Sequence, residues 1–179
     1  MSENEYTTAA EDVKRFFGRI SVEADATNRK IDGYADRMGR ITKQGNPAEF
    51  DAIIKGSAAD FELFAHRIDE LIPGYRRNLD LLTKGFDETV KSLDPATEAG
   101  ARELEGMRRE TKALAETARE VKAKVTALRG ILAIMRDANH DPRLTQSARS
   151  VITTVDALFT AYEDLETFAL KVSFSANQK

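Results

Sequence analysis

The two histidines are the residues of this chain best suited to metal binding or acid–base chemistry. His66 follows Glu62 by one helical turn, and His140 follows Asp137 by three residues, so each imidazole has one carboxylate within reach. A di-iron site in a helical bundle requires two Glu-x-x-His pairs and two further inward glutamates, and neither histidine has a glutamate three residues before it. We therefore expect no metal and no cofactor. We interpret His66 as part of a solvated helix face and His140 as a loop residue.

Covalent catalysis has no sequence support either. The 179 residues include no cysteine, which excludes thiol catalysis and cysteine-ligated zinc. The ten glycines are scattered singly, unlike the glycine-rich loops that bind phosphate groups, and no serine, histidine and acid share a known catalytic motif. The sequence thus predicts no catalytic residues and a protein that is not an enzyme.

A run of basic residues in the third quarter of the chain is the strongest charge feature. It comprises Arg108, Arg109, Lys112, Arg119, Lys122, Lys124 and Arg129, interleaved with Glu103, Glu105, Glu110, Glu116 and Glu120. Glu105 with Arg109 and Glu120 with Lys124 form favourable one-turn pairs. The whole chain balances 27 basic against 30 acidic residues. We interpret this run as a solvated, salt-bridged face and expect no nucleic-acid partner.

Helix starts are marked by proline. Three of the four prolines follow an Asn or Asp, in Asn46-Pro47, Asp94-Pro95 and Asp141-Pro142. The polar side chain caps free N–H groups, and proline at the first helical position gives up an N–H that has no partner. Ser2 and Glu5 form a capping-box pattern near the first residue. These signals predict four helices near 6–43, 47–92, 95–138 and 142–172.

Apolar residues in these segments recur at alternating steps of three and four. The first segment has Val13, Phe17, Ile20, Ala24 and Thr27 in this register, and Thr111 falls on the seam of the third. A seam of this period packs against other helices with coiled-coil-like interdigitation, and short connections make consecutive helices antiparallel. We predict one all-α domain over residues 1–179, a long up-and-down antiparallel four-helix bundle with coiled-coil-like heptad packing. We expect the seam threonines to bond back to carbonyls of their own helix.

Pro73-Gly74 interrupts the second helical segment. Proline inside a helix removes a hydrogen bond and clashes with the preceding turn, yet the apolar face continues through Ile68, Leu71 and Tyr75. The pattern therefore predicts a kink at Pro73 and Gly74, and a candidate hinge, within one helix that does not turn back.

The fourth segment has an unusually wide apolar stripe. Ile152 and Phe159 flank its seam on one side, and Ala161 and Phe168 flank it on the other. One interpretation, which we favour, is a broad core face. The other is a candidate partner or self-association surface formed by Ile152, Phe159 and Phe168.

Together these features favour a non-enzymatic interaction protein, an adaptor, scaffold or oligomer building block that acts through protein partners or self-association. One alternative is a small-molecule sensor, with a ligand bound between helices and a shift of one helix as output. The layout is similar in architecture to the four-helix sensor bundles of bacterial chemoreceptors, but architecture does not transfer function. The other is a membrane-active amphipathic protein, although charge balance gives no reason to expect a membrane surface as partner. No signal-peptide pattern or long apolar run is present, which predicts a cytoplasmic protein.

Overall fold

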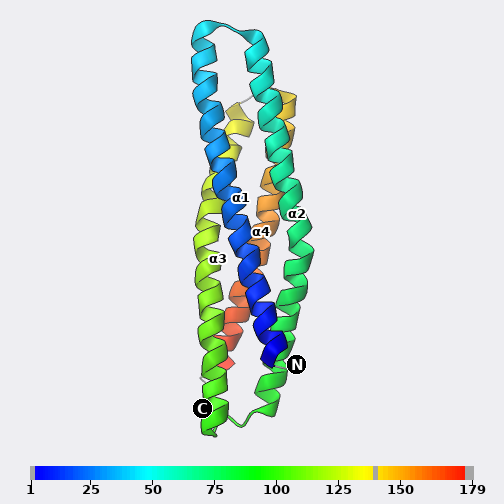
Figure 1. Cartoon of the computed structure of the whole chain (residues 1–179), viewed down its shortest axis with the longest axis vertical. Coiled ribbons are helices and arrows are strands. Elements are labelled where there is room, and N and C mark those ends of the chain that lie inside the picture. The colour runs from blue at the N-terminus through cyan, green and yellow to red at the C-terminus, as the bar shows by residue number, and fades with distance from the viewer. Residues whose placement is uncertain (1–2, 139–140, 176–179) are drawn as a thin grey trace. The chain divides into compact units, whose positions relative to one another are not determined.

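Four long helices make up the protein (Figure 1). The computed structural model describes residues 3–138 and 141–175, and within them the helices are α1 (Glu3–Gln44), α2 (Pro47–Ser92), α3 (Glu98–Ala138) and α4 (Pro142–Ser175), with no strand. They pack as an all-α four-helix bundle with up-and-down connections, as predicted. Within the described ranges no helix combines the length and apolarity needed to cross a bilayer. Ser2 and His140 lie outside the described residues.

Two of the predicted helix starts are capped as expected. The side-chain oxygen of Asn46 accepts from the Glu49 N–H at 3.4 Å, and that of Asp141 accepts from the Arg143 N–H at 2.9 Å. Between α1 and α2, Gly45 has a φ of 68°, a left-handed conformation that glycine adopts without steric cost. The sequence signals at these two junctions therefore translate directly into local structure.

The start of α3 differs from the prediction. The helix begins at Glu98 and not at Pro95, because Asp94 caps a separate turn first: its side chain accepts from the Ala96 N–H, and its carbonyl oxygen accepts from the Thr97 N–H at 3.0 Å. The helix cap is Thr97, whose hydroxyl oxygen accepts from the Gly100 N–H at 3.1 Å. An Asp-Pro pair thus initiates a turn here, and the next residue able to cap starts the helix.

The helices contribute to two compact units. The first unit contains Met1–Gly18, Leu71–Lys122 and Phe159–Lys179, and the second contains Arg19–Glu70 and Ala123–Leu158. Each unit therefore takes one segment from each helix. α2 passes through Pro73 as an unbroken helix, so the chain does not turn back there. The bend itself, and the folding of residues 1–179 as a single domain, stay predictions.

Ion pairs on the second unit define which helices are neighbours. They join α1 to α2, α3 to α4, α1 to α3 and α2 to α4, through Lys30–Asp60 (2.5 Å), Arg129–Asp156 (2.8 Å), Lys124–Asp25 (2.7 Å) and Arg143–Asp51 (2.8 Å). Exposed pairs form between helices that share an edge. The remaining combinations, α1 with α4 and α2 with α3, therefore face each other across the diagonal. Two of the four edges, α1/α3 and α2/α4, join parallel helices.

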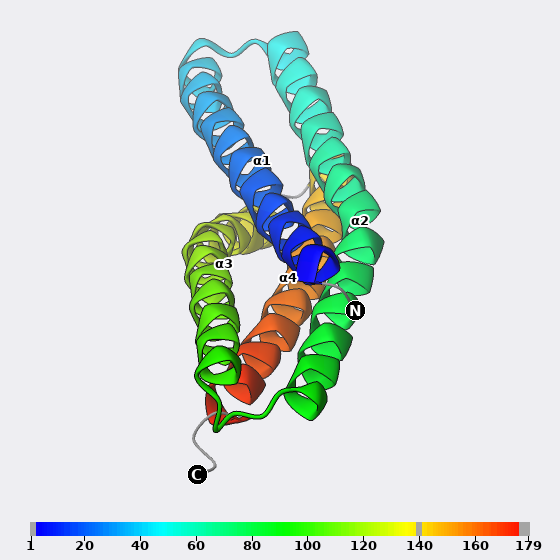
Figure 2. The ribbon, with the colours of Figure 1, turned by 60° about the horizontal axis from the view of Figure 1, so that its bottom comes forward.

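The first unit has the same arrangement. Contacts run along the α1/α2, α1/α3, α2/α4 and α3/α4 edges, through Phe16–Tyr75, Tyr6–Thr111, Tyr75–Ala161 and Arg108–Ser173. In this unit α2 and α3 lie on opposite sides in both views, with α1 and α4 between them (Figures 1 and 2). The connection over residues 93–97 thus joins two helices across the diagonal, an arrangement that short loops alone do not predict.

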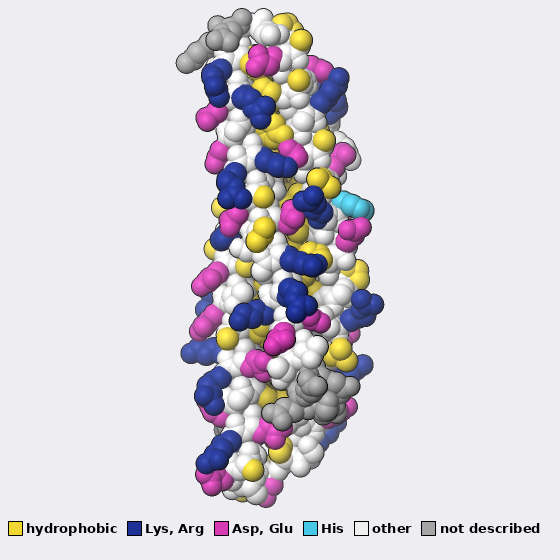
Figure 3. Space-filling model, in the orientation of Figure 1, with side chains coloured by type: hydrophobic (Ala, Val, Ile, Leu, Met, Phe, Trp, Pro, Cys, Tyr) yellow, Lys and Arg dark blue, Asp and Glu magenta, His cyan; other side chains and the backbone are white. Residues whose placement is uncertain are grey.

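Burial places the predicted seams in the core. Val13, Phe17, Ile20, Ala24 and Thr27 of the α1 seam are all buried, so the apolar period identifies the core face correctly. The coiled-coil-like interdigitation of these side chains stays a prediction. On the outer surface shown in Figure 3, side chains of both charge signs are interspersed.

The wide stripe of α4 is mainly a core face. Ile152 is 8% exposed in the second unit and Phe168 is 4% exposed in the first, while Phe159 is half-buried. Phe168 packs edge-on against Phe86 with ring centroids 6.2 Å apart. The burial of Ile152 and Phe168 favours the interpretation as a broad core face, and the partner surface stays a prediction.

Candidate groove between α3 and α4

The structure does not bring the histidine candidates into a site. His66 pairs with Glu70 at 3.2 Å and not with Glu62, and its side chain is largely exposed. Asp137 pairs with Arg136 at 2.7 Å, and its proposed partner His140 lies outside the described residues. Across the two described ranges, no group of three His, Asp or Glu residues is placed to hold a metal ion.

The basic run of α3 divides among several settings instead of forming one solvated face. Lys124 pairs with Asp25 of α1 at 2.7 Å and not with Glu120 of its own helix. Lys122 lies over the ring of Tyr162, 4.0 Å from its centroid, a cation–π contact. Arg129 pairs with Asp156. The four remaining cations, Arg108, Arg109, Lys112 and Arg119, line one groove.

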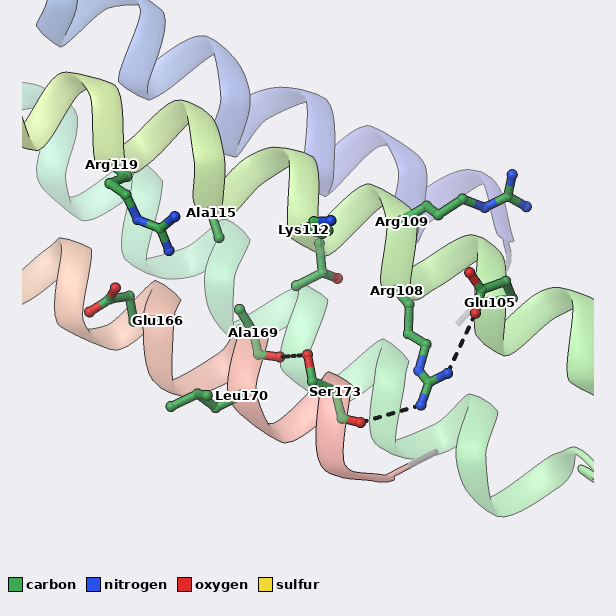
Figure 4. A pocket seen from close by; sticks show the side chains of 11 residues that line it. Glu105, Arg108, Arg109, Lys112, Ala115, Arg119, Glu166, Ala169, Leu170 and Ser173 are labelled. Carbon is green, nitrogen blue, oxygen red and sulfur yellow. Dashed lines mark hydrogen bonds and ion pairs between the residues drawn. The ribbon is translucent and has the colours of Figure 1, made fainter. Parts of the chain in front are cut away.

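This α3–α4 groove lies within the first unit and has a volume of about 620 Å³. Its α3 wall is formed by Glu105, Arg108, Arg109, Thr111, Lys112, Ala115 and Arg119, and its α4 wall by Glu166, Ala169, Leu170 and Ser173. In Figure 4, Ala115 and Ala169 point toward each other between the helices, whereas Arg109 points away from α4. The groove exists because alanine leaves space at an interhelical position that a larger seam residue would fill.

Polar contacts tie the two helices at one end of the groove. Arg108 donates to the Ser173 carbonyl oxygen at 3.3 Å and pairs with Glu105 at 3.4 Å (Figure 4). Both distances lie at the long limit for a hydrogen bond. Arg108 is therefore positioned at this end of the groove by contacts with both helices.

Tyr162 contacts residues at the other end of the groove. Its hydroxyl donates to Glu166 Oε1 at 2.6 Å. The pKa of Tyr162 is raised, chiefly because burial disfavours the phenolate and also because of Glu166, while the adjacent Arg119 opposes the shift. Arg119 of α3 and Glu166 of α4 extend toward each other at this end of the groove (Figure 4), and both interact with the Tyr162 hydroxyl.

Thr111 is the most buried residue of the α3 wall. Its hydroxyl donates to the Met107 carbonyl oxygen at 2.7 Å and bonds to the Tyr6 hydroxyl at 3.3 Å, so the predicted back-bond of this seam threonine is confirmed. Leu170 on the α4 wall is 57% exposed, and Phe174 one turn later is also well exposed. Leu170 and Phe174 are one turn apart and therefore form a small exposed apolar patch on α4.

Sequence reasoning identified half of this site. It singled out Arg108, Arg109, Lys112 and Arg119 but interpreted them as a solvated face. It missed Ala115, Ala169 and Leu170, which make the hollow and its apolar wall. A usable signal was present: Leu170 directly follows the seam residue Ala169, so a large apolar side chain stands off the core face of α4.

A second hollow of about 510 Å³ lies among α1, α2 and α3 in the first unit. Polar residues line much of it, including Thr7, Thr89, Arg102 and Glu110. The pKa of Glu110 is raised, first by burial and then by repulsion from Glu11. This hollow thus combines polar side chains with a partly buried carboxyl group.

Comparisons with known proteins add no assignment: no family model, curated protein or solved structure matches the chain.

Proposed function

We propose that this protein is a non-enzymatic interaction module that binds a helical segment of a protein partner in the α3–α4 groove. The observation that supports it most is the exposed Leu170 beside the hollow between Ala115 and Ala169. Two roughly antiparallel helices with small residues between them form a trough into which an amphipathic helix fits. A cytoplasmic location and self-association are further parts of the proposal that need their own measurements.

The test uses amphipathic peptides as probes. Fluorescein-labelled peptides of about 18 residues, each with one leucine stripe and with an acidic, a neutral or a basic polar face, are titrated with the protein and followed by anisotropy. This length spans the groove as a helix. We expect at least one peptide to bind the wild type and to lose affinity about fivefold with Leu170→Ser, the change expected for removing one partly buried leucine contact.

Ile134→Ser is the matched control. Ile134 is an exposed aliphatic residue of α3 in the second unit, so the same substitution there leaves the groove intact. The proposal fails if no peptide binds, or if Leu170→Ser and Ile134→Ser weaken binding equally.

A second candidate function is a small-molecule sensor, supported by the polar hollow among α1, α2 and α3. A ligand that binds only the folded state raises the melting temperature. A thermal-shift screen of small polar metabolites on wild type and on Gly106→Leu, which adds a side chain at the wall of this hollow, tests it. The sensor proposal requires a hit whose shift disappears in the variant.

A further inference from the structure

We infer that the occupant of the α3–α4 groove is an acidic amphipathic helix, with carboxylates spaced to meet Arg108, Lys112 and Arg119. This inference rests on the proposed function and adds the chemistry of the partner. Arg109 points away from α4, so three cations, Arg108, Lys112 and Arg119, and two carboxylates, Glu105 and Glu166, face the groove (Figure 4), and its local charge is +1 by subtraction. A carboxylate-bearing partner is attracted to such a wall, and a basic partner is repelled.

The groove's own acids leave the central cation weakly engaged. Glu105 and Glu166 stand toward the two ends, with Arg108 and with Tyr162 respectively. Lys112, between them, pairs within the described part of the chain with Glu116, at 3.9 Å and with both side chains well exposed. Exposed pairs of this kind contribute little. A partner that covers the groove excludes water from its apolar floor. A carboxylate of that partner therefore interacts more strongly with the Lys112 ammonium group than the exposed Glu116 does.

Helical spacing fixes the pattern of the partner. Arg108, Lys112 and Arg119 stand at i, i+4 and i+11 on α3, a span of about 16 Å at 1.5 Å per residue. Both Lys112 and Arg119 are exposed, and Arg119 extends from α3 toward Glu166 of α4 (Figure 4). A helix lying alongside α3 and parallel to it has the same rise per residue, so its carboxylates at i, i+4 and i+11 meet these cations in turn. Its apolar stripe then rests on Leu170 and the Ala115–Ala169 floor.

A helical partner segment fits this groove better than an extended peptide does. In the described part of the chain the groove has no strand edge with which an extended segment could pair. A helix makes its main-chain hydrogen bonds internally and offers only side chains to the groove, which is the helix-in-groove mode of recognition.

The first experiment compares three probe peptides that share the leucine stripe. One carries Glu at i, i+4 and i+11, one carries Gln there, and one carries Lys. We expect the Glu peptide to bind about tenfold tighter than the Gln peptide, equivalent to two or three moderate ion pairs, and we expect this advantage to shrink with added salt. Equal binding of the Glu and Gln peptides would overturn the inference while leaving the proposed function standing.

The second experiment exchanges the charges. We expect Lys112→Glu to lower the affinity for the Glu peptide about tenfold. The same variant should bind the Lys peptide, which has a lysine at i+4, more tightly than the wild type does. Lys14 is an exposed residue of α1 in the same unit, so Lys14→Glu is the control for the change in net charge. If Lys14→Glu has the same effect as Lys112→Glu, the attraction is not located in the groove, and the inference is wrong.

Anionic lipid is the competing occupant of a cationic apolar site. Co-sedimentation with phosphatidylserine vesicles, compared with phosphatidylcholine vesicles, separates the two. We expect no pelleting dependent on Lys112. Pelleting that Lys112→Glu abolishes, together with no binding of the Glu peptide, would replace the acidic helix with a membrane surface.

Discussion

Tyr75 of α2 donates a hydrogen bond from its hydroxyl to the main-chain carbonyl oxygen of Ala161 in α4, over 2.5 Å. Its ring also stacks on Phe16 of α1, with centroids 4.5 Å apart, and meets Phe17 edge-on. One buried side chain therefore joins three helices of the first unit, two residues after Pro73.

Removing the Tyr75 hydroxyl tests this link. We expect Tyr75→Phe to lower the free energy of unfolding by about 1 kcal/mol, the net contribution of one buried hydrogen bond. Tyr75→Ala should cost about 3–5 kcal/mol, because it also leaves a cavity among the aromatic rings. Urea unfolding followed by circular dichroism measures both. Wild-type stability in Tyr75→Phe would mean that the bond contributes nothing.

Alkaline pH should destabilise the protein through its tyrosines. The pKa of each of the four is raised, chiefly because burial disfavours the phenolate: Tyr34 to about 12, and Tyr6, Tyr75 and Tyr162 in the same direction. Between the unfolded pKa near 10 and the folded value, the folded state holds more protons than the unfolded state. Stability is thus fully present below about pH 10 and falls as pH rises above it.

Two measurements check the tyrosine prediction. The ultraviolet absorbance of tyrosinate should appear well above pH 10 in the folded protein and near pH 10 in urea. The loss of stability above pH 10 should also be smaller in Tyr75→Phe than in the wild type. Titration of all four phenols near pH 10 in the folded protein would contradict the prediction.

Gly100 is required at the start of α3. A methyl group there would lie 2.3 Å from the Asp94 carbonyl oxygen and 3.1 Å from Thr97 Oγ1, so alanine must open the turn that precedes the helix. We expect Gly100→Ala to destabilise by about 1–3 kcal/mol, although alanine normally favours a helix. Gly130→Ala, at an exposed α3 position with nothing within 4 Å, should stabilise by about 0.5–1 kcal/mol. Thermal melts measure the stability of both variants. If Gly100→Ala and Gly130→Ala change the melting temperature in the same direction, the turn does not require glycine at position 100.

A charged side chain should destabilise the protein strongly at position 152 and hardly at all at position 134. Ile152→Lys places an ammonium group in the core and should cost at least about 3 kcal/mol. Ile134 is 70% exposed, so Ile134→Lys should change stability by less than about 0.5 kcal/mol. Chemical denaturation of the two variants measures this difference. A stable, folded Ile152→Lys would instead favour the flank of α4 as a partner surface.

Local signals predicted the helices well and their side-chain partners poorly. Asn46 and Asp141 cap as expected because a cap depends only on residues within one turn. Asp94 misled because two capping residues, Asp94 and Thr97, compete within four positions. Lys124 has a suitable partner on its own helix, yet it pairs with Asp25, which tertiary packing brings to the same edge.

The candidate groove shows the same division. The four cations were evident from the sequence, but a hollow depends on which residues of a neighbouring helix stand opposite, and that register is not local information. Ala115 and Ala169 are unremarkable alanines until α3 and α4 bring them face to face. The exposure of Leu170 and the burial of Phe168, two residues apart on one wide stripe, likewise depend on where α3 and α2 cover α4.

The sequence by itself determined that the chain forms four helices, where most of them begin, and which face of each is buried, because capping and apolar period are properties of one helix at a time. Only the tertiary structure decided the order of the helices around the bundle. With short loops, α3 can follow α2 either along an edge or across the diagonal, and both choices keep consecutive helices antiparallel. The difference lies in the cross-helix contacts, such as Lys124 with Asp25 and Tyr75 with Ala161, which form only when α1 neighbours α3 and α2 neighbours α4.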